Sequence, residues 1–422
     1  MQRVVITGMG CLTPAGNSPE ALWDSLESGR SGIRPHVPAD NKLDAELDPI
    51  LKFRNTGQVQ GFETSSFNPT QLQTTERCAQ FAITAARNSA QQSQVTQHHP
   101  ADRIGVILGC STNGRLADEP EVVRVHRDNG RVHPLAIPRS MASNGVSQIA
   151  IDQQITGPSF TLSTACASGA HAIGLAFHMV RSGILNAALA GAHEAPLTRV
   201  FLRGWDSMRV VSPTFCRPFS GDRDGMTLAE GAAVLTLETL ASAKARNATI
   251  FAEILGFGMS ADAHHITQPR PDGPAQAIRA CLLDAARTLH ATDQPGNMLS
   301  LLEEIGYVNA HGTATQTNDA VEAAAIAAVF GPRTPHIPLS GTKGFMGHSI
   351  GASSAIETVI TALALHHRRL PFTLGTTACD PTLNLDLITG APRVVPGQAP
   401  ILALTNALAF GGLNAILCLR SY

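Results

Sequence analysis

Short apolar runs alternate with longer segments of helical periodicity along most of the chain. The runs cover residues 104–108, 187–191, 233–237, 307–308 and 402–405, and each consists almost wholly of aliphatic and small residues. Such runs are typical of strands buried on both faces, and their alternation with helices predicts an α/β fold with parallel or mixed sheets. Two polar stretches, residues 91–102 and 292–297, are expected to be surface loops.

Cys166 lies where one of these patterns changes into the other. An apolar, hydroxyl-rich segment precedes it, and small and apolar residues follow at helical spacing, namely Ala170, Ile173, Ala176 and Phe177. The cysteine is therefore expected at a strand-to-helix junction, where free N–H groups and the helix dipole stabilise a thiolate and favour a nucleophile near neutral pH. A free cysteine is also often a small core residue, so this segment alone leaves both interpretations open.

Two downstream motifs each place a histidine among glycines and hydroxyl residues. His311 lies in Asn-Ala-His-Gly-Thr-Ala-Thr (309–315), and His348 lies in Lys-Gly-Phe-Met-Gly-His-Ser (343–349). Both motifs follow short apolar runs, which predicts loops at strand ends, where functional groups collect. The glycine pair in Phe-Gly-Gly-Leu-Asn (410–414) allows a ligand to approach the backbone closely. One histidine in a loop is more often structural, but the four segments together predict a catalytic site.

With these motifs the chain resembles the elongating β-ketoacyl-acyl carrier protein synthases, types I and II, which belong to the thiolase-like condensing enzymes. The resemblance runs from residues 3–10 to residues 415–417 and includes Arg-Pro-Phe (217–219) and Asp-Arg-Asp-Gly (222–225). Segment 140–143 is similar to the first type, and segment 256–263 to the second. The resemblance implies a duplicated thiolase fold with five layers, α-β-α-β-α, and two mixed sheets. Residues 1–253 would form the half with the nucleophilic cysteine, and residues 254–422 the half with both histidine motifs.

The resemblance also implies a reaction, the decarboxylative condensation of an acyl thioester with malonyl-acyl carrier protein. In it, Cys166 would take the acyl group from the carrier's phosphopantetheine, which is covalent catalysis. The N–H groups of Cys166 and Phe410 would form the oxyanion hole, and the Phe410 ring would gate the acyl pocket. His311 and His348, as neutral N–H donors, would stabilise the enolate that forms when malonyl loses carbon dioxide.

Further residues take supporting roles by the same resemblance. Lys343 would assist the histidines through its charge and hydrogen bonds, since an ammonium has donors but no acceptor. Glu357 is the expected partner of Lys343, although an ordinary ion pair is nearly as good an interpretation, and Asn406 is expected to support the site. Thr313 and Thr315 correspond to hydroxyls that bind the pantetheine amides, and their i, i+2 spacing on an extended loop points both the same way.

Substrate and carrier contacts are less sharply indicated. Thr112 corresponds to the depth of the acyl pocket, where the family often has a larger apolar residue, but such a loop position is also often neutral. The helix that usually carries a basic cluster for the acidic carrier protein has one positive charge here, in residues 71–77. Arg209 matches a carrier-facing arginine, and Arg124 and Arg127, with Arg131, are candidates for a second patch, although a charged run is usually a solvated face.

Composition agrees with an intracellular enzyme. The 422 residues carry a formal charge of −2, so no broad basic field favours nucleic acid. The eight cysteines have no C-x-x-C pairs, which argues against a disulfide framework and a structural zinc site, and no metal or resident cofactor is expected. The chain has no signal-like start and no apolar run of membrane-spanning length, so we expect no membrane partner and a cytoplasmic location.

Several alternatives remain at this point. The acyl carrier protein is the expected partner, and the chain is expected to form a homodimer in which segment 140–145 lies near the partner's pocket. The same surface could instead receive a homologous chain-length subunit without which the chain is inactive. A non-catalytic chain-length subunit would lack the nucleophile, and a thiolase would carry a second catalytic cysteine. A carrier-dependent acyltransferase is the harder rival, and the pair of histidines favours condensation over it.

Overall fold

Two sets of strands with the same order form the sheets of the molecule. In the computed structural model, which describes residues 1–37, 51–112, 114–290 and 295–422, the first set follows the order β1-β7-β6-β4-β5. These strands are β1 (Val4–Leu12), β4 (Ile104–Gly109), β5 (Ser159–Leu162), β6 (Ala187–Glu194) and β7 (Gly231–Thr239). β4 is parallel to β5 and β6, whereas β7 is antiparallel to both of its neighbours.

The second set repeats this arrangement in the order β8-β15-β14-β9-β10-β12. Its strands are β8 (Ala252–Ala261), β9 (Ile305–Ala310), β10 (Pro338–Gly341), β12 (Asp386–Leu387), β14 (Leu402–Ala409) and β15 (Leu413–Ser421). Again the inner strands β14, β9 and β10 are parallel and β15 is antiparallel. We number the strands of each set by their position in the chain, which gives β1, β4, β5, β6 and β7 in the first set and β8, β9, β10, β14 and β15 in the second. In space both sets then have the order 1-5-4-2-3, which is the signature of a duplicated fold.

The two mixed sheets meet along β1 and β8. Residues 4–6 of β1 pair with residues 252–254 of β8 in antiparallel register, so eleven strands are hydrogen-bonded in one continuous row. Glu253 of β8 is buried at this seam and binds Arg3 at 2.6 Å and also Arg420 of β15. The division of the chain at residue 253 stays a prediction, and it falls on the strand through which the halves are joined.

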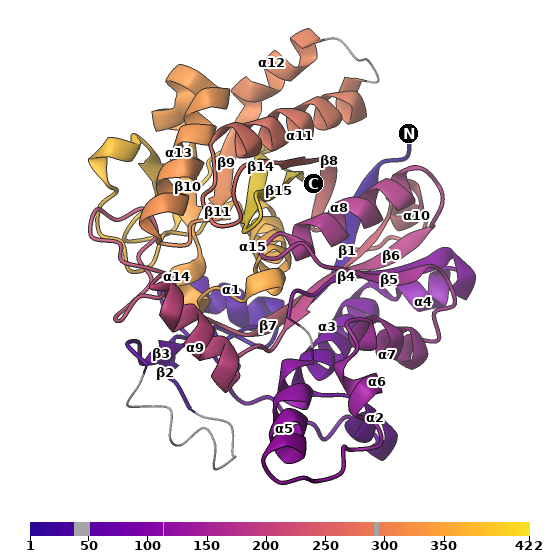
Figure 1. The fold of residues 1–422 in the computed structure, drawn as a ribbon. Coiled ribbons are helices and arrows are strands. Elements are labelled where there is room, and N and C mark those ends of the chain that lie inside the picture. The colour runs from indigo at the N-terminus through magenta and orange to yellow at the C-terminus, as the bar shows by residue number, and fades with distance from the viewer. Residues whose placement is uncertain (38–50, 113, 291–294) are drawn as a thin grey trace.

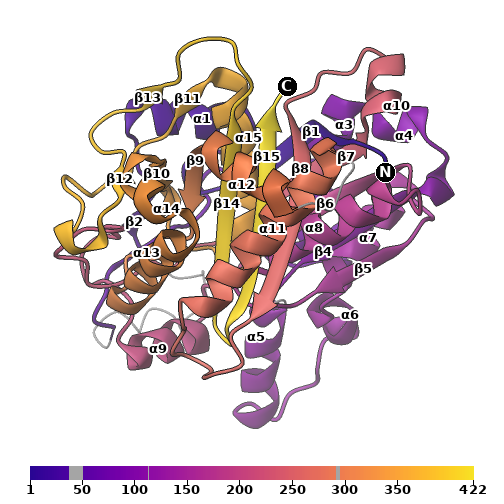
Figure 2. The same cartoon turned by 90° about the horizontal axis from the view of Figure 1, so that it is seen from above.

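Helices form three layers, one between the two sheets and one outside each (Figures 1 and 2). Along β7, Leu235 packs into the central core with α8 (Ser168–Arg181) and α15 (Ser353–His367), while Val234 faces α3 (Arg77–Ser93) and α7 (Asn144–Gln153). Along β15, Leu417 faces the central core and Ile416 faces α11 (Asp272–His290) and α13 (Gln316–Phe330). Side chains alternate between the faces of a strand, so each sheet is covered on both sides. The predicted five-layered α/β fold is confirmed.

Shorter elements complete the described chain. They are α1 (Pro19–Ser28), α2 (Pro69–Thr74), α4 (Val95–His98), α5 (Arg115–His126), α6 (Ala136–Ser140), α9 (Arg199–Met208), α10 (Leu240–Ala245), α12 (Pro295–Glu304), α14 (Lys343–Met346), β2 (Arg34–Pro35), β3 (Asn55–Thr56), β11 (Arg369–Leu370) and β13 (Arg393–Val394), and the 3-10 helices Ala101–Arg103, Gly331–His336, Ile350–Ala352 and Pro381–Leu383. None of the helices described here is both long enough and apolar enough to cross a bilayer.

The expectation of surface loops at residues 91–102 and 292–297 is wrong for the parts that the structure describes. Residues 91–102 contain the end of α3, all of α4 and the start of a 3-10 helix, and they bury Ser93 and Val95. Residues 295–297 begin α12, whereas 291–294 lie outside the described residues. In 91–102 a few inward-facing side chains suffice to dock the segment, so its polar composition reflects only the face that meets solvent.

Candidate active site

Cys166 stands on a tight turn between β5 and α8. Ala165 has φ +49°, a left-handed conformation uncommon for a residue with a side chain, and Thr164 and Cys166 form an isolated bridge around it. Such local strain persists where the surrounding structure imposes it, frequently at functional sites. The turn leaves Cys166 6% exposed at the edge of a cavity, and the backbone N–H of Phe410, which follows β14, contacts its sulfur.

His348 lies beside this sulfur. Its Nε2 is 3.1 Å from Cys166 Sγ, and its Nδ1 is 2.8 Å from the hydroxyl of Ser353, the first residue of α15. The backbone N–H of His348 donates to the Thr227 carbonyl at 2.7 Å, so the backbone of His348 is anchored as well as its ring. The expectation of a loop at a strand end holds only in part here, because the single turn of α14 separates His348 from β10.

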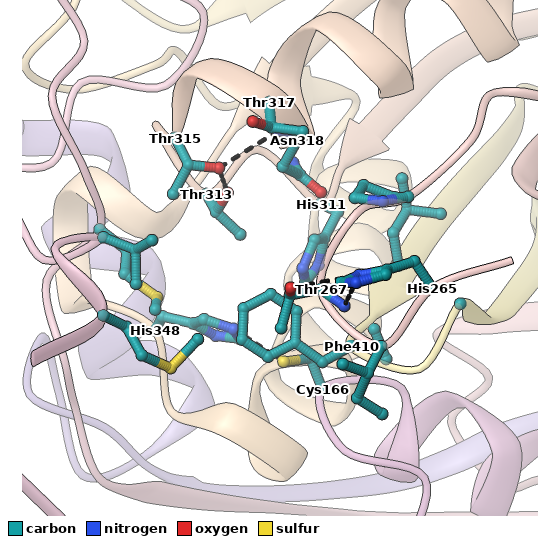
Figure 3. Close-up of a pocket in the computed structure, with 18 of the residues that line it drawn as sticks. Cys166, His265, Thr267, His311, Thr313, Thr315, Thr317, Asn318, His348 and Phe410 are labelled. Carbon is teal, nitrogen blue, oxygen red and sulfur yellow. Dashed lines mark hydrogen bonds between the residues drawn. The ribbon is translucent and has the colours of Figure 1, made fainter. Parts of the chain in front are cut away.

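His311 follows the last residue of β9 and faces the same cavity from the other side (Figure 3). The two imidazole rings are 5.4 Å apart, edge to face. Lys343 Nζ lies 3.4 Å from His311 Nδ1, donates to the His311 carbonyl, and pairs with Glu357 Oε1 at 2.5 Å. Because an ammonium only donates hydrogen bonds, His311 Nδ1 must accept, which leaves the ring proton on Nε2.

Burial decides the protonation of all three cavity groups. It lowers the pKa of His311 and of His348 well below the usual value, and the charge of Lys343 lowers both further. Burial also raises the pKa of the Cys166 thiol to about 11, against the opposing effects of Lys343 and the N–H groups of Phe410 and Cys166. Both imidazoles are thus neutral at pH 7, as expected. Burial works against the thiolate expected at the helix start, because the removal of water outweighs the Lys343 charge and the two N–H groups.

The cavity above Cys166 has a volume of about 220 Å³ and two chemically different sides. On one side the hydroxyls of Thr313 and Thr315 are 3.0 Å apart (Figure 3), so the two predicted pantetheine ligands are brought together. On the other side the Phe410 ring stacks on Trp205 of α9, with the ring centroids 5.5 Å apart. This shape offers hydrogen bonds along one wall and apolar contact along the other.

A family model described as "Beta-ketoacyl synthase, N-terminal domain" matches residues 1–243, and one described as "Beta-ketoacyl synthase, C-terminal domain" matches residues 251–377. The chain belongs to the β-ketoacyl synthase family. The predicted family, the predicted acyltransferase class and the predicted decarboxylative condensation are therefore confirmed.

Full-length relatives agree with this assignment. The chain is 35% identical to "Nodulation protein E" of Rhizobium sp. (strain N33), over 99% of each protein. It is 34% identical to "3-oxoacyl-[acyl-carrier-protein] synthase 2" of Staphylococcus aureus (strain COL), over 100% of this chain and 99% of that protein. A solved structure described as "The ishigamide ketosynthase/chain length factor" aligns with a TM-score of 0.89 and 31% identity, over 100% of this chain and 99% of that one.

Two buried carboxylates of α13, which the sequence analysis missed, shape the His311 loop of this ketosynthase. Glu322 accepts hydrogen bonds from the N–H groups of His311 (2.8 Å) and Gly312 (2.9 Å) and from the side chain of Asn406 (3.1 Å). Asp319 accepts from the N–H of Ala314, and burial raises its pKa to about 6. Their sequence signal is two acids at i, i+3 on an alanine-rich helix directly after the histidine motif. Asn406, for which a supporting role is predicted, contacts the His311 loop only through Glu322 in these hydrogen bonds.

The predicted docking and pocket residues are scattered. Arg209 is exposed, next to Met208 and Val210 at the cavity, whereas Arg124 and Arg127 are exposed on and just after α5 and form ion pairs with Glu121 and Asp128, respectively. Thr112 does not line the cavity in the single chain, and its hydroxyl donates to the buried Glu194.

Proposed function

We propose that Cys166 is the nucleophile that carries the growing acyl chain. The observation behind this is the approach of His348 Nε2 to the Cys166 sulfur at 3.1 Å, with the Phe410 N–H directed at the same atom. Since the thiol is protonated at rest, His348 accepts its proton as the sulfur attacks the carrier thioester. The new thioester bond forms as the carbon–sulfur bond to pantetheine breaks, and the proton passes to the departing pantetheine sulfur. The N–H groups of Cys166 and Phe410 hold the carbonyl oxygen.

The second half of the reaction uses the neutral histidines. Malonyl-carrier loses carbon dioxide, and the electron pair of the broken carbon–carbon bond forms an enolate. The enolate oxygen accepts hydrogen bonds from the ring N–H groups of His311 and His348. The enolate carbon then attacks the Cys166 thioester, and the cysteine sulfur leaves. Lys343 fixes the donor tautomer of His311, and Ser353 can do the same for His348 by donating its O–H to Nδ1.

The substrate arm and its carrier enter along the threonine wall. We infer that Thr313 and Thr315 bind the amides of phosphopantetheine, because their paired hydroxyls line the cavity. Arg209 is the docking residue best supported for an acidic carrier, because it is exposed beside the cavity, whereas Arg124 and Arg127 are engaged with neighbouring acids. Thr112 remains a candidate for the pocket depth only in an assembly in which a second chain extends the cavity.

We infer that the working unit is a homodimer formed along β5. This strand ends the sheet order and pairs with β4, which leaves its other edge available to a second strand. Beside it Ile137 and Ile151 are 72% and 70% exposed, and Met141 is 42% exposed. Apolar side chains gathered at a sheet edge favour a protein partner. A homologous chain-length subunit could occupy the same surface, since the description of one similar structure names a chain length factor together with a ketosynthase.

Acyl transfer can be tested by mapping the modified residue. After incubation with an acyl-carrier, peptide mass spectrometry should place the acyl group on Cys166, and the Cys166→Ala variant should carry no acyl group. Cys216→Ser is the matched control, because Cys216 is also buried near Thr313 but does not line the cavity. Labelling that persists in Cys166→Ala, or that is lost in the control, contradicts the assignment.

Decarboxylation can be measured separately as carbon dioxide released from malonyl-carrier. His311→Ala and His348→Ala should each slow release by about a hundred- to a thousandfold, the usual loss for one donor to a developing oxyanion. Acylation of Cys166 should fall much less in His311→Ala. If both variants release carbon dioxide at wild-type rates, the assignment of His311 and His348 to the enolate is wrong.

A further inference from the structure

The structure gathers a second set of cysteine and histidine side chains that do not line the cavity. Among the described residues, two groups of three such side chains place their potential ligand atoms within 4.8 Å of one another. One group is Cys166, His311 and His348. The other is Cys78 at the start of α3, Cys110 just after β4, and His193 in β6, and all three are buried. We propose that Cys78, Cys110 and His193 bind a structural zinc ion.

The distances suit a tetrahedral ion. Two sulfurs on zinc lie about 3.8 Å apart because each Zn–S bond is about 2.3 Å, and Cys78 Sγ is 4.0 Å from Cys110 Sγ. Cys78 Sγ is 3.0 Å from His193 Nδ1, so this pair must open by about half an ångström to reach its separation on zinc. Two thiolates and one neutral imidazole are also a donor set typical of zinc.

Charge makes this ion compatible with a buried site. When Zn²⁺ enters, the two thiol protons leave, and the two thiolates neutralise the two positive charges of the ion. The resulting group needs no counterion, so it avoids the large cost of a net charge in the core.

The space around His193 is shaped for its ring. An added Cβ at Gly145 would stand 2.6 Å from His193 Nε2, so a glycine at this position leaves the space that the imidazole occupies. Glu76 is buried beside the cysteines, but its carboxylate is not among the ligand atoms that lie within 4.8 Å of one another, so Cys78, Cys110 and His193 are the protein ligands of the ion.

The ion would join three elements behind the acyl-transfer site. Cys110 directly precedes Ser111 and Thr112, whose N–H groups donate to Glu194, the residue after His193. Zinc would therefore tie the first turn of α3 to the carboxyl ends of β4 and β6. The expectation of no zinc site rested on spacing along the chain, and positions 78, 110 and 193 come together only through the fold.

Metal content tests the proposal without reference to activity. The untagged protein should be expressed with added zinc, freed of loosely bound metal and analysed by inductively coupled plasma mass spectrometry. We expect about one zinc per chain in the wild type and in Cys166→Ala, and at least about a tenfold loss in Cys78→Ser and in Cys110→Ser. Cys281→Ser, at a buried cysteine of α11, is the matched control and should keep its zinc.

Three results overturn the proposal: a wild type that takes up no zinc, zinc that persists in both cysteine variants, and zinc that is lost in Cys166→Ala, which would place it in the cavity. A Cys78–Cys110 disulfide, seen as the loss of two hydrogens in the intact mass of protein prepared under reducing conditions, also overturns it. If the serine variants do not fold, Co²⁺ titration of Cys166→Ala decides instead. A thiolate-to-cobalt charge-transfer band supports the site, and its absence refutes it.

Discussion

Ser353 and Lys343 each hold one nitrogen of a cavity histidine and leave the other nitrogen for chemistry. His348 contacts the Ser353 hydroxyl through Nδ1 and Cys166 through Nε2. A hydroxyl can donate or accept, so it lets His348 alternate between accepting the thiol proton and donating to the enolate. Lys343 can only donate, which keeps His311 a donor to the cavity. The two imidazoles are therefore chemically different although both are neutral.

Ser353→Ala should slow carbon dioxide release from malonyl-carrier by about tenfold, which corresponds to about 1.4 kcal/mol. The loss arises because His348 no longer has a partner that fixes its donor tautomer, so Ser353→Thr should restore the rate. Ser349→Ala is the control, because the Ser349 hydroxyl is equally buried but donates to the Glu230 carbonyl. Equal effects of the two alanine variants would indicate a general structural role for Ser353.

The pKa directions predict a simple dependence on pH. The pKa values of His311 and His348 lie well below 6.5, so carbon dioxide release should not change between about pH 6.5 and 8 and should fall only on the acid side. The unfolded chain protonates these histidines first, so stability that is present above pH 6.5 is lost as the pH falls below it. A pH–rate profile with its acid midpoint at or above 6.5 would show that one of the two histidines is charged.

At the scale of elements, close contact between α3 and β1 positions the outer layer on the first sheet. An added Cβ at Gly10 of β1 would stand 2.1 Å from the Ala85 carbonyl oxygen of α3, which is a backbone atom that cannot rotate away. The helix therefore lies against the strand at a distance that only glycine permits. The left-handed turn at Ala165 also positions an element, since α8 begins three residues after it.

Gly10→Ala should lower the free energy of unfolding by about 1–3 kcal/mol, because α3 must move away from β1. Gly204→Ala, in α9 with nothing within 4 Å of the added Cβ, should leave stability unchanged or raise it by up to about 1 kcal/mol. Chemical denaturation of both variants measures the difference. A Gly10→Ala variant as stable as the wild type would mean that the layers slide past one another at little cost.

Assembly is the property that belongs to the whole molecule. The exposed edge of β5 and the apolar side chains near it predict a homodimer of about 89 kDa, twice the chain mass of 44.4 kDa. Light scattering should show this mass for the wild type and the monomer mass for Ile137→Asp combined with Ile151→Asp. Val394→Asp is the control, because Val394 is an exposed apolar residue on β13, away from this edge.

Activity separates the two forms of assembly. A homodimer that elongates acyl-carriers alone supports the simple synthase. A chain that is inactive alone and becomes active only when co-expressed with a homologous subunit would show that this surface serves a heterodimer.

The sequence alone was enough for the fold class, the family and the motifs that bring Cys166, His311 and His348 to the cavity. Continuous apolar runs such as 233–237 can be buried only inside a covered sheet, so their pattern carries the α/β fold. Cys166, His311 and His348 stand in short motifs whose glycines and hydroxyls serve the chemistry of neighbouring residues. A linear sequence displays such local constraints directly.

Other features depend on contacts between distant segments, and no local pattern records them. The pKa of Cys166 rises because burial excludes water, which outweighs the Lys343 charge and the N–H groups that lower it. Glu322 reaches the His311 loop only because α13 folds back across it. Cys78, Cys110 and His193 are 32 to 115 residues apart in sequence and meet only where the start of α3 lies beside the ends of β4 and β6. Burial and long-range proximity are products of packing, so these properties belong to the tertiary structure.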